Sequence, residues 1–125
     1  GSVRQLGGWV CAYRAVEAAP SARVQLYTRG LGFAPGHPGY SRELAVAYLW
    51  LGELHPAARR IFAGKALRAS AAGLRSTPDH PGLLETTGIA VWWRGDPATG
   101  RRYLAAANAL RPWRRPAPPA RRSVL

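Results

Sequence analysis

The sequence predicts an all-α protein built from about three helix-turn-helix pairs stacked on one another. The phrase Pro-x-His-Pro-Gly at residues 35–39 returns 43 residues later, at 78–82. The same shift aligns identical residues further along the chain: Ala47 with Ala90, Trp50 with Trp93, and Gly52 with Gly95. One amphipathic helix pair cannot bury its apolar face alone, so repeated pairs are expected to stack. The repeated phrase then marks the joint between stacked units.

Turn residues divide each unit into two helices. Gly52 and Gly95 each follow about a dozen residues of helical character, and a Pro-Ala pair follows soon after each of them. Gly suits the left-handed end of a helix and Pro suits the first turn of the next one. Pro20 occupies the same place in an earlier copy. The expected helices are 3–18 with 21–33, 40–51 with 57–75, and 83–93 with 98–110. The repeat domain thus covers residues 1–112, with pairs over about 3–33, 40–75 and 83–110.

The units resemble the tetratricopeptide repeat (TPR), whose signature residues extend over about 34 positions. In the third unit these positions hold Leu84, Thr87, Gly88, Val91, Gly100, Leu104, Ala107 and Pro112. In the second they hold Ser41, Leu44, Ala45, Tyr48, Ala57 and Ile61, and in the first Tyr13, Ala22, Leu26 and Pro35. The resemblance implies a right-handed, TPR-like α-solenoid. A step of 43 residues also falls within the range of HEAT and armadillo repeats.

The first helix of each pair supplies the candidate binding residues. Helical spacing places Leu84, Thr87 and Val91 on one face of the third unit, which we take as its core face. Trp93 points about 160° away from the middle of that face, and Trp50 repeats this arrangement. In the family that the sequence resembles, first helices line a concave groove. Mapped onto this sequence, the groove residues are Arg42, Val46, Leu49, Trp50, Glu85, Ile89, Trp92 and Trp93. The alternative is that these aromatic residues pack against a neighbouring unit or against Trp113.

The chain is strongly basic, with 18 Lys and Arg residues against six acids and a net charge of +12. Lys65, Arg68 and Arg75 share one face of the predicted helix 57–75, and we call these three residues the basic stripe. The Pro-rich tail, 113–125, adds Arg114, Arg115, Arg121 and Arg122. A basic face of this kind is often only the solvated side of an amphipathic helix. It also fits electrostatic binding of nucleic acid or of an anionic surface.

The sequence gives little support for metal binding, phosphate binding or catalysis. His37, His55 and His80 lack the short-spaced ligand pair that is typical of a zinc site. The segment 95–102 has Gly95 and Gly100 at phosphate-loop spacing, but Arg101 and Arg102 replace the Lys-Ser/Thr pair. No constellation of catalytic residues is evident, so we expect no enzyme activity, metal or cofactor. The single cysteine, Cys11, is compatible with a reducing compartment such as the cytoplasm. Runs without charge are too short to span a membrane.

These observations predict a protein-interaction module or scaffold whose groove binds a largely apolar or acidic peptide, or a partner's helix. Trp and Arg, which are frequent among the groove residues, often dominate the binding energy of interfaces. Nucleic acid remains the alternative partner. Because the last helix pair is followed by a Pro-rich tail and not by a polar capping helix, we also expect self-association or a larger parent protein.

Overall fold

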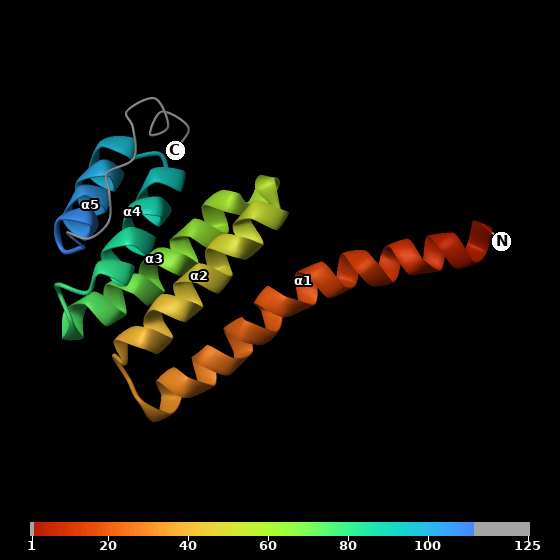
Figure 1. Cartoon of the computed structure of the whole chain (residues 1–125), viewed down its shortest axis with the longest axis horizontal. Coiled ribbons are helices and arrows are strands. Elements are labelled where there is room, and N and C mark those ends of the chain that lie inside the picture. The colour runs from red at the N-terminus through yellow and green to blue at the C-terminus, as the bar shows by residue number, and fades with distance from the viewer. Residues whose placement is uncertain (1, 112–125) are drawn as a thin grey trace.

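The computed structural model describes the backbone of residues 2–111 and the side chains of residues 18–111. In this part of the chain the regular structure is helical, and it contains no strand (Figure 1). The elements are α1 (Ser2–Phe33), α2 (Pro38–Leu54), a 3-10 turn (Pro56–Ala58), α3 (Arg59–Ser76), α4 (Pro81–Trp93) and α5 (Pro97–Ala109). Each helix packs against the next in the chain, and α2 also contacts α4. The predicted tail, 113–125, lies outside the described residues.

The helices of the second and third pairs lie close to their predicted ranges, and local residues account for their ends. Each of α2, α4 and α5 begins with Pro in its first turn. A Pro at this place costs no hydrogen bond, because the first N–H groups of a helix have no partner within it. Gly95 closes α4 with a φ of +103°, a conformation that glycine adopts without strain. Gly52 does not end its helix as expected, since α2 continues to Leu54 before Pro56 follows.

The prediction of a first helix pair is wrong. Residues 2–33 form one helix, where the sequence predicts two that are separated at Pro20. Figure 1 shows α1 bending along its length, with its N-terminal end leading away from α2 to α5. An internal proline removes one hydrogen bond and typically kinks a helix. Two strong helix formers, Ala18 and Ala19, precede Pro20, and no glycine is present there to end the helix. Pro20 itself is buried.

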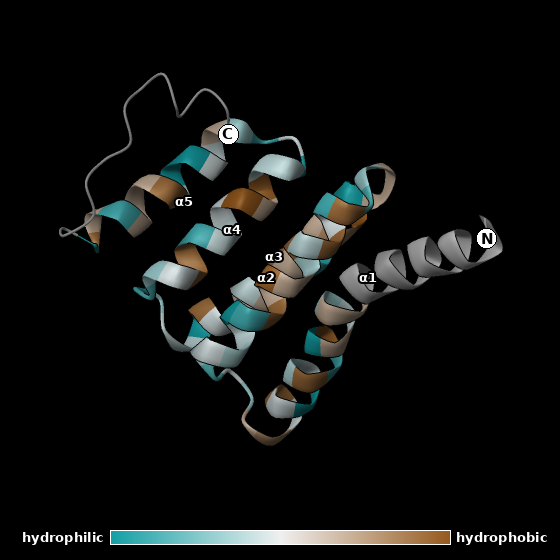
Figure 2. Ribbon diagram, turned by 45° about the vertical axis from the view of Figure 1, so that its right-hand side comes forward, coloured by the Kyte–Doolittle hydropathy of each residue, from teal (hydrophilic) through white to brown (hydrophobic). Residues whose placement is uncertain are grey.

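Small residues bring the middle helices close together. Ala45, Leu49, Ala66 and Ala90 form a buried cluster in which α2, α3 and α4 meet. Next to this cluster the buried hydroxyls of Ser70 and Thr86 lie 2.6 Å apart and join α3 to α4. Figure 2 shows hydrophilic and hydrophobic residues mixed along α2 to α5. The core therefore draws buried residues from α2 to α5, and α4 is buried on more than one side because α2, α3 and α5 all contact it.

The last two helices cross at a pair of glycines. A β-carbon added at Gly88 would lie 2.9 Å from the carbonyl oxygen of Gly100. One added at Gly100 would lie 2.8 Å from the carbonyl oxygen of Gly88. Both distances are shorter than an ordinary carbon–oxygen contact, so the backbones of α4 and α5 approach too closely for any side chain between them.

Candidate functional site

The two equivalent tryptophans lie at joints between elements. Trp93 is half-buried and packs against the α2–α3–α4 cluster. A β-carbon at Gly52 would lie 3.2 Å from its ring, and the Arg59 guanidinium is 5.1 Å from its ring centroid. Trp50, also half-buried, has the Arg23 guanidinium of α1 5.7 Å from its ring centroid. The Trp93 ring therefore packs toward the core cluster, where the sequence predicts an outward direction, and the Trp50 ring lies beside Arg23 of α1.

The other apolar groove residues are also divided among several contacts. Leu49 is buried in the central cluster, and Ile89 packs against that cluster. Trp92 lies against α5, where its Cβ is 3.1 Å from the β-carbon position of Gly100. The Arg101 guanidinium is 5.2 Å from the centroid of the Trp92 ring. Val46 is half-buried. The structure thus does not gather these side chains into one open apolar surface.

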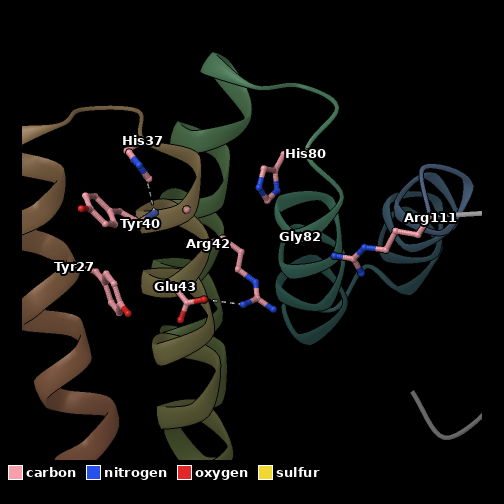
Figure 3. A pocket seen from close by; sticks show the side chains of 9 residues that line it. Tyr27, His37, Tyr40, Arg42, Glu43, His80, Gly82 and Arg111 are labelled. Atoms are coloured by element: carbon pink, nitrogen blue, oxygen red, sulfur yellow. Dashed lines mark hydrogen bonds and ion pairs between the residues drawn. The ribbon is translucent and has the colours of Figure 1, made fainter. Parts of the chain in front are cut away.

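An open depression lies beside the two polar groove residues, Arg42 and Glu85. It has a volume of about 570 Å³. It lies where α2 and α4 begin, with Tyr27 of α1 on one side and Arg111 on the other (Figure 3). We call it the joint depression. Its lining residues are Tyr27, His37, Gly39, Tyr40, Arg42, Glu43, His80, Gly82 and Arg111. The repeated Pro-x-His-Pro-Gly phrase therefore supplies four of the nine: His37, Gly39, His80 and Gly82.

The two histidines cap their helices. Nδ1 of His37 accepts a hydrogen bond from the backbone N–H of Tyr40 at 3.1 Å, and Nδ1 of His80 accepts one from Leu83 at 3.2 Å. When Nδ1 of a neutral imidazole accepts, the ring hydrogen is on Nε2, which is then a donor. The sequence argues against a zinc site at these histidines, but it does not predict that they cap helices. The signal for a cap was the Pro-Gly pair that follows each histidine and opens a helix.

A third helix, α5, is capped by a carboxylate instead of a histidine. Oδ1 of Asp96 accepts a hydrogen bond from the Thr99 backbone N–H at 3.1 Å at the start of α5. Hydrogen bonding to Thr99 lowers the pKa of the Asp96 carboxyl, because the bond favours the charged form. Asp96 is thus the N-terminal cap of α5.

Two arginines from different elements meet at the joint depression. The Arg42 guanidinium pairs with Glu43 at 2.7 Å, and that of Arg111 pairs with Glu85 at 2.7 Å. Figure 3 shows Arg42 reaching from α2 toward α4, where Gly82 leaves room for it. A β-carbon at Gly82 would lie 3.2 Å from Cγ of Arg42. Glu85 is thus connected to the site through Arg111, a residue that the sequence analysis did not select.

The depression has more donors than acceptors. A guanidinium carries five N–H donors, so one ion pair leaves donors over on Arg42 and on Arg111. The histidine Nε2–H groups and the hydroxyls of Tyr27 and Tyr40 add further donors. A carboxylate accepts several hydrogen bonds and is strongly preferred by guanidinium groups. The arrangement can therefore bind an anionic, acceptor-rich group at an open surface.

The basic stripe is exposed along α3, with Lys65, Arg68 and Arg75 all on the surface. The Lys65 ammonium lies 5.9 Å from the ring centroids of both Tyr48 and Phe62. The remaining predicted basic residues, Arg114, Arg115, Arg121 and Arg122, lie outside the described residues.

Comparisons with family models, with curated proteins and with solved structures each gave no match. None of the described helices has the length and apolar character needed to cross a membrane. In the same part of the chain, no three His, Cys, Asp or Glu side chains are grouped as a metal site would require.

Proposed function

We propose that the chain is a non-enzymatic protein-interaction module, a TPR-like solenoid that binds an acidic peptide from a partner protein. The sequential packing of α1 to α5, together with the contact between α2 and α4, supports a solenoid. In this proposal the peptide lies across the beginnings of α2 and α4. Its acidic group occupies the joint depression and accepts hydrogen bonds from Arg42.

The donor-rich joint depression is the observation that supports this function most. It lies at a joint that the repeat creates, and it is open enough for a side chain of a bound peptide. The half-buried tryptophans support a structural role better than a recognition role, so we assign the specificity to the polar end of the predicted groove. The apolar groove residues then hold the helices that position Arg42 and Arg111.

Replacing Arg42 with Ala should weaken peptide binding about 10- to 100-fold. A hydrogen bond to a charged group contributes about 1.5–3 kcal/mol, and 1.4 kcal/mol corresponds to about a tenfold change in affinity. We suggest selecting peptides from a random library on the unmodified protein, then measuring their affinities by fluorescence anisotropy. The selected peptides should be enriched in Asp or Glu.

The matched control is Arg29→Ala, which removes one exposed arginine of α1 that does not line the joint depression. It should change affinity less than twofold. Because the ion pair between Arg42 and Glu43 is partly exposed, its loss should affect stability little. If Arg42→Ala and Arg29→Ala bind the selected peptides equally well, the joint depression is not the binding site.

A further inference from the structure

The outer face of α3 combines charge with an exposed apolar side chain. Ile61, Lys65, Arg68 and Arg75 follow one another at spacings of four, three and seven residues, so they lie on one side of the helix. All four are exposed, and Ile61 is 64% exposed. With a rise of 1.5 Å per residue, this face extends over about 21 Å, or about four turns.

No acid neutralises this face. Between Glu53 and Asp79 the sequence has five cationic residues and no Asp or Glu: Arg59, Arg60, Lys65, Arg68 and Arg75. Among the side chains that the structure describes, none forms an ion pair with Lys65 or Arg68. The charge of the basic stripe is therefore available to a ligand.

An apolar hollow lies beside the basic stripe. It has a volume of about 370 Å³, and we call it the α2/α3 hollow. Leu44 and Tyr48 of α2 line one side of it, and Lys65, Arg68 and Ala69 of α3 line the other. The Lys65 ammonium stays near the Tyr48 and Phe62 rings, so its aliphatic part covers apolar surface while its charge remains at the rim. The hollow thus offers an apolar floor with two cations at its edge.

We infer that this surface docks an amphipathic helix of another protein whose apolar side chains are flanked by Asp or Glu. One apolar side chain of that helix fills the α2/α3 hollow, and a second covers Ile61. Its acids pair with Lys65, Arg68 and Arg75 along the four turns. Charge complementarity selects this occupant over a second copy of the chain, because a protein with a net charge of +12 repels itself.

The apolar elements also favour a protein helix over nucleic acid. Phosphate contacts require only positive charge within reach, and they gain nothing from Ile61 or from the apolar floor. An apolar side chain on the partner gains from both, because it removes their surface from water. The site is separate from the joint depression, which shares no lining residue with the α2/α3 hollow.

The test uses a labelled 16-residue helical peptide with Leu along one face and Glu on both flanks, and a scrambled peptide of identical composition. Fluorescence anisotropy at about 150 mM salt is the readout. The Lys65→Glu/Arg68→Glu variant should bind the amphipathic peptide at least tenfold more weakly than the unmodified protein. The control, Arg29→Glu/Arg102→Glu, has the same change in charge at exposed positions off this face and should bind within about twofold.

Replacing the exposed Ile61 with Ser separates helix docking from charge alone. This variant should bind the amphipathic peptide about three- to tenfold more weakly, and the scrambled peptide should bind much more weakly to every protein. Far-UV circular dichroism checks folding. If the charge-reversed variant unfolds, Lys65→Gln/Arg68→Gln replaces it with the same expectation.

Three results would each overturn the inference. The first is the absence of measurable binding of the amphipathic peptide, and the second is equal binding of the scrambled peptide. The third is tighter binding of a 16-nucleotide single-stranded DNA, or of vesicles rich in phosphatidylglycerol, that depends on Lys65 and Arg68 but not on Ile61. That result would assign the basic stripe to nucleic acid or to an anionic lipid surface.

Discussion

Replacing Trp93 with Ala is expected to lower the free energy of unfolding by about 2–4 kcal/mol. Complete burial would place the loss at about 3–5 kcal/mol, and the ring of Trp93 is half-buried. The indole packs against the cluster of Ala45, Leu49, Ala66 and Ala90, and the three alanines have no side-chain freedom with which to refill the space. Urea denaturation followed by circular dichroism measures the change.

Phe33→Ala is the control for Trp93→Ala, because Phe33 is also a large aromatic residue but is 91% exposed. It should change stability by less than about 0.5 kcal/mol. A Trp93→Ala variant that is as stable as the unmodified protein, but that fails to bind partners, would contradict the structural role. Such a result would instead indicate that Trp93 binds partners, as the sequence predicted.

Replacing Gly88 with Ala is expected to destabilise the protein by about 1–3 kcal/mol, the usual range for overpacking. The new methyl group would lie 2.9 Å from the Gly100 carbonyl oxygen and 3.0 Å from Cγ of Leu104. Backbone cannot move aside as a flexible side chain can, so α4 and α5 must separate. The helix propensity of Ala, worth about 1 kcal/mol over Gly, offsets only part of this cost.

The same substitution at Gly32 should stabilise the protein instead of destabilising it. A β-carbon at Gly32 in α1 meets nothing within 4 Å, so Gly32→Ala gains helix propensity without a clash, up to about 1 kcal/mol. Thermal denaturation should separate the two variants clearly, since 1 kcal/mol corresponds to roughly 3–6 °C in a domain of this size. Equal stability of Gly88→Ala and Gly32→Ala would show that α4 and α5 do not cross as closely as described.

Helix existence could be predicted because its signals are local. Pro38, Pro81 and Pro97 each stand in the first turn of a helix, and Gly95 ends one. Each residue acts on the backbone next to it, whatever the rest of the chain does. The break at Pro20 could not be predicted in this way. The outcome there depends on the preceding alanines, which favour continuing the helix, and on the burial of Pro20 against its surroundings.

The contacts of the groove residues could not be predicted from periodicity. Helical spacing gives the angle between two side chains, but it does not say which helix covers that angle. In α4, residues on several sides are buried, including Leu83, Thr86, Thr87 and Ala90, because α2, α3 and α5 all contact this helix. The assumption that α4 has a single core face was therefore too simple. The joint depression was missed for a related reason, since it joins Tyr27 to Arg111 across most of the described chain.

The repeated Pro-x-His-Pro-Gly phrase connects architecture to the proposed function. Its prolines and histidines begin α2 and α4, and its glycines leave room at the joint, where Arg42 crosses Gly82. The same residues then line the joint depression. The same histidines that cap α2 and α4 thus both line the joint depression, where their Nε2–H groups could donate hydrogen bonds to a bound acid.

Chemical-shift mapping tests the central claim most directly. A selected acidic peptide would be titrated into the ¹⁵N-labelled chain and followed in ¹H–¹⁵N spectra. The account predicts that the largest changes fall on the backbone amides of Gly39, Tyr40 and Gly82 and on the side-chain Nε–H of Arg42. Changes confined to the outer faces of α3 or α5, with those four signals unmoved, would contradict it.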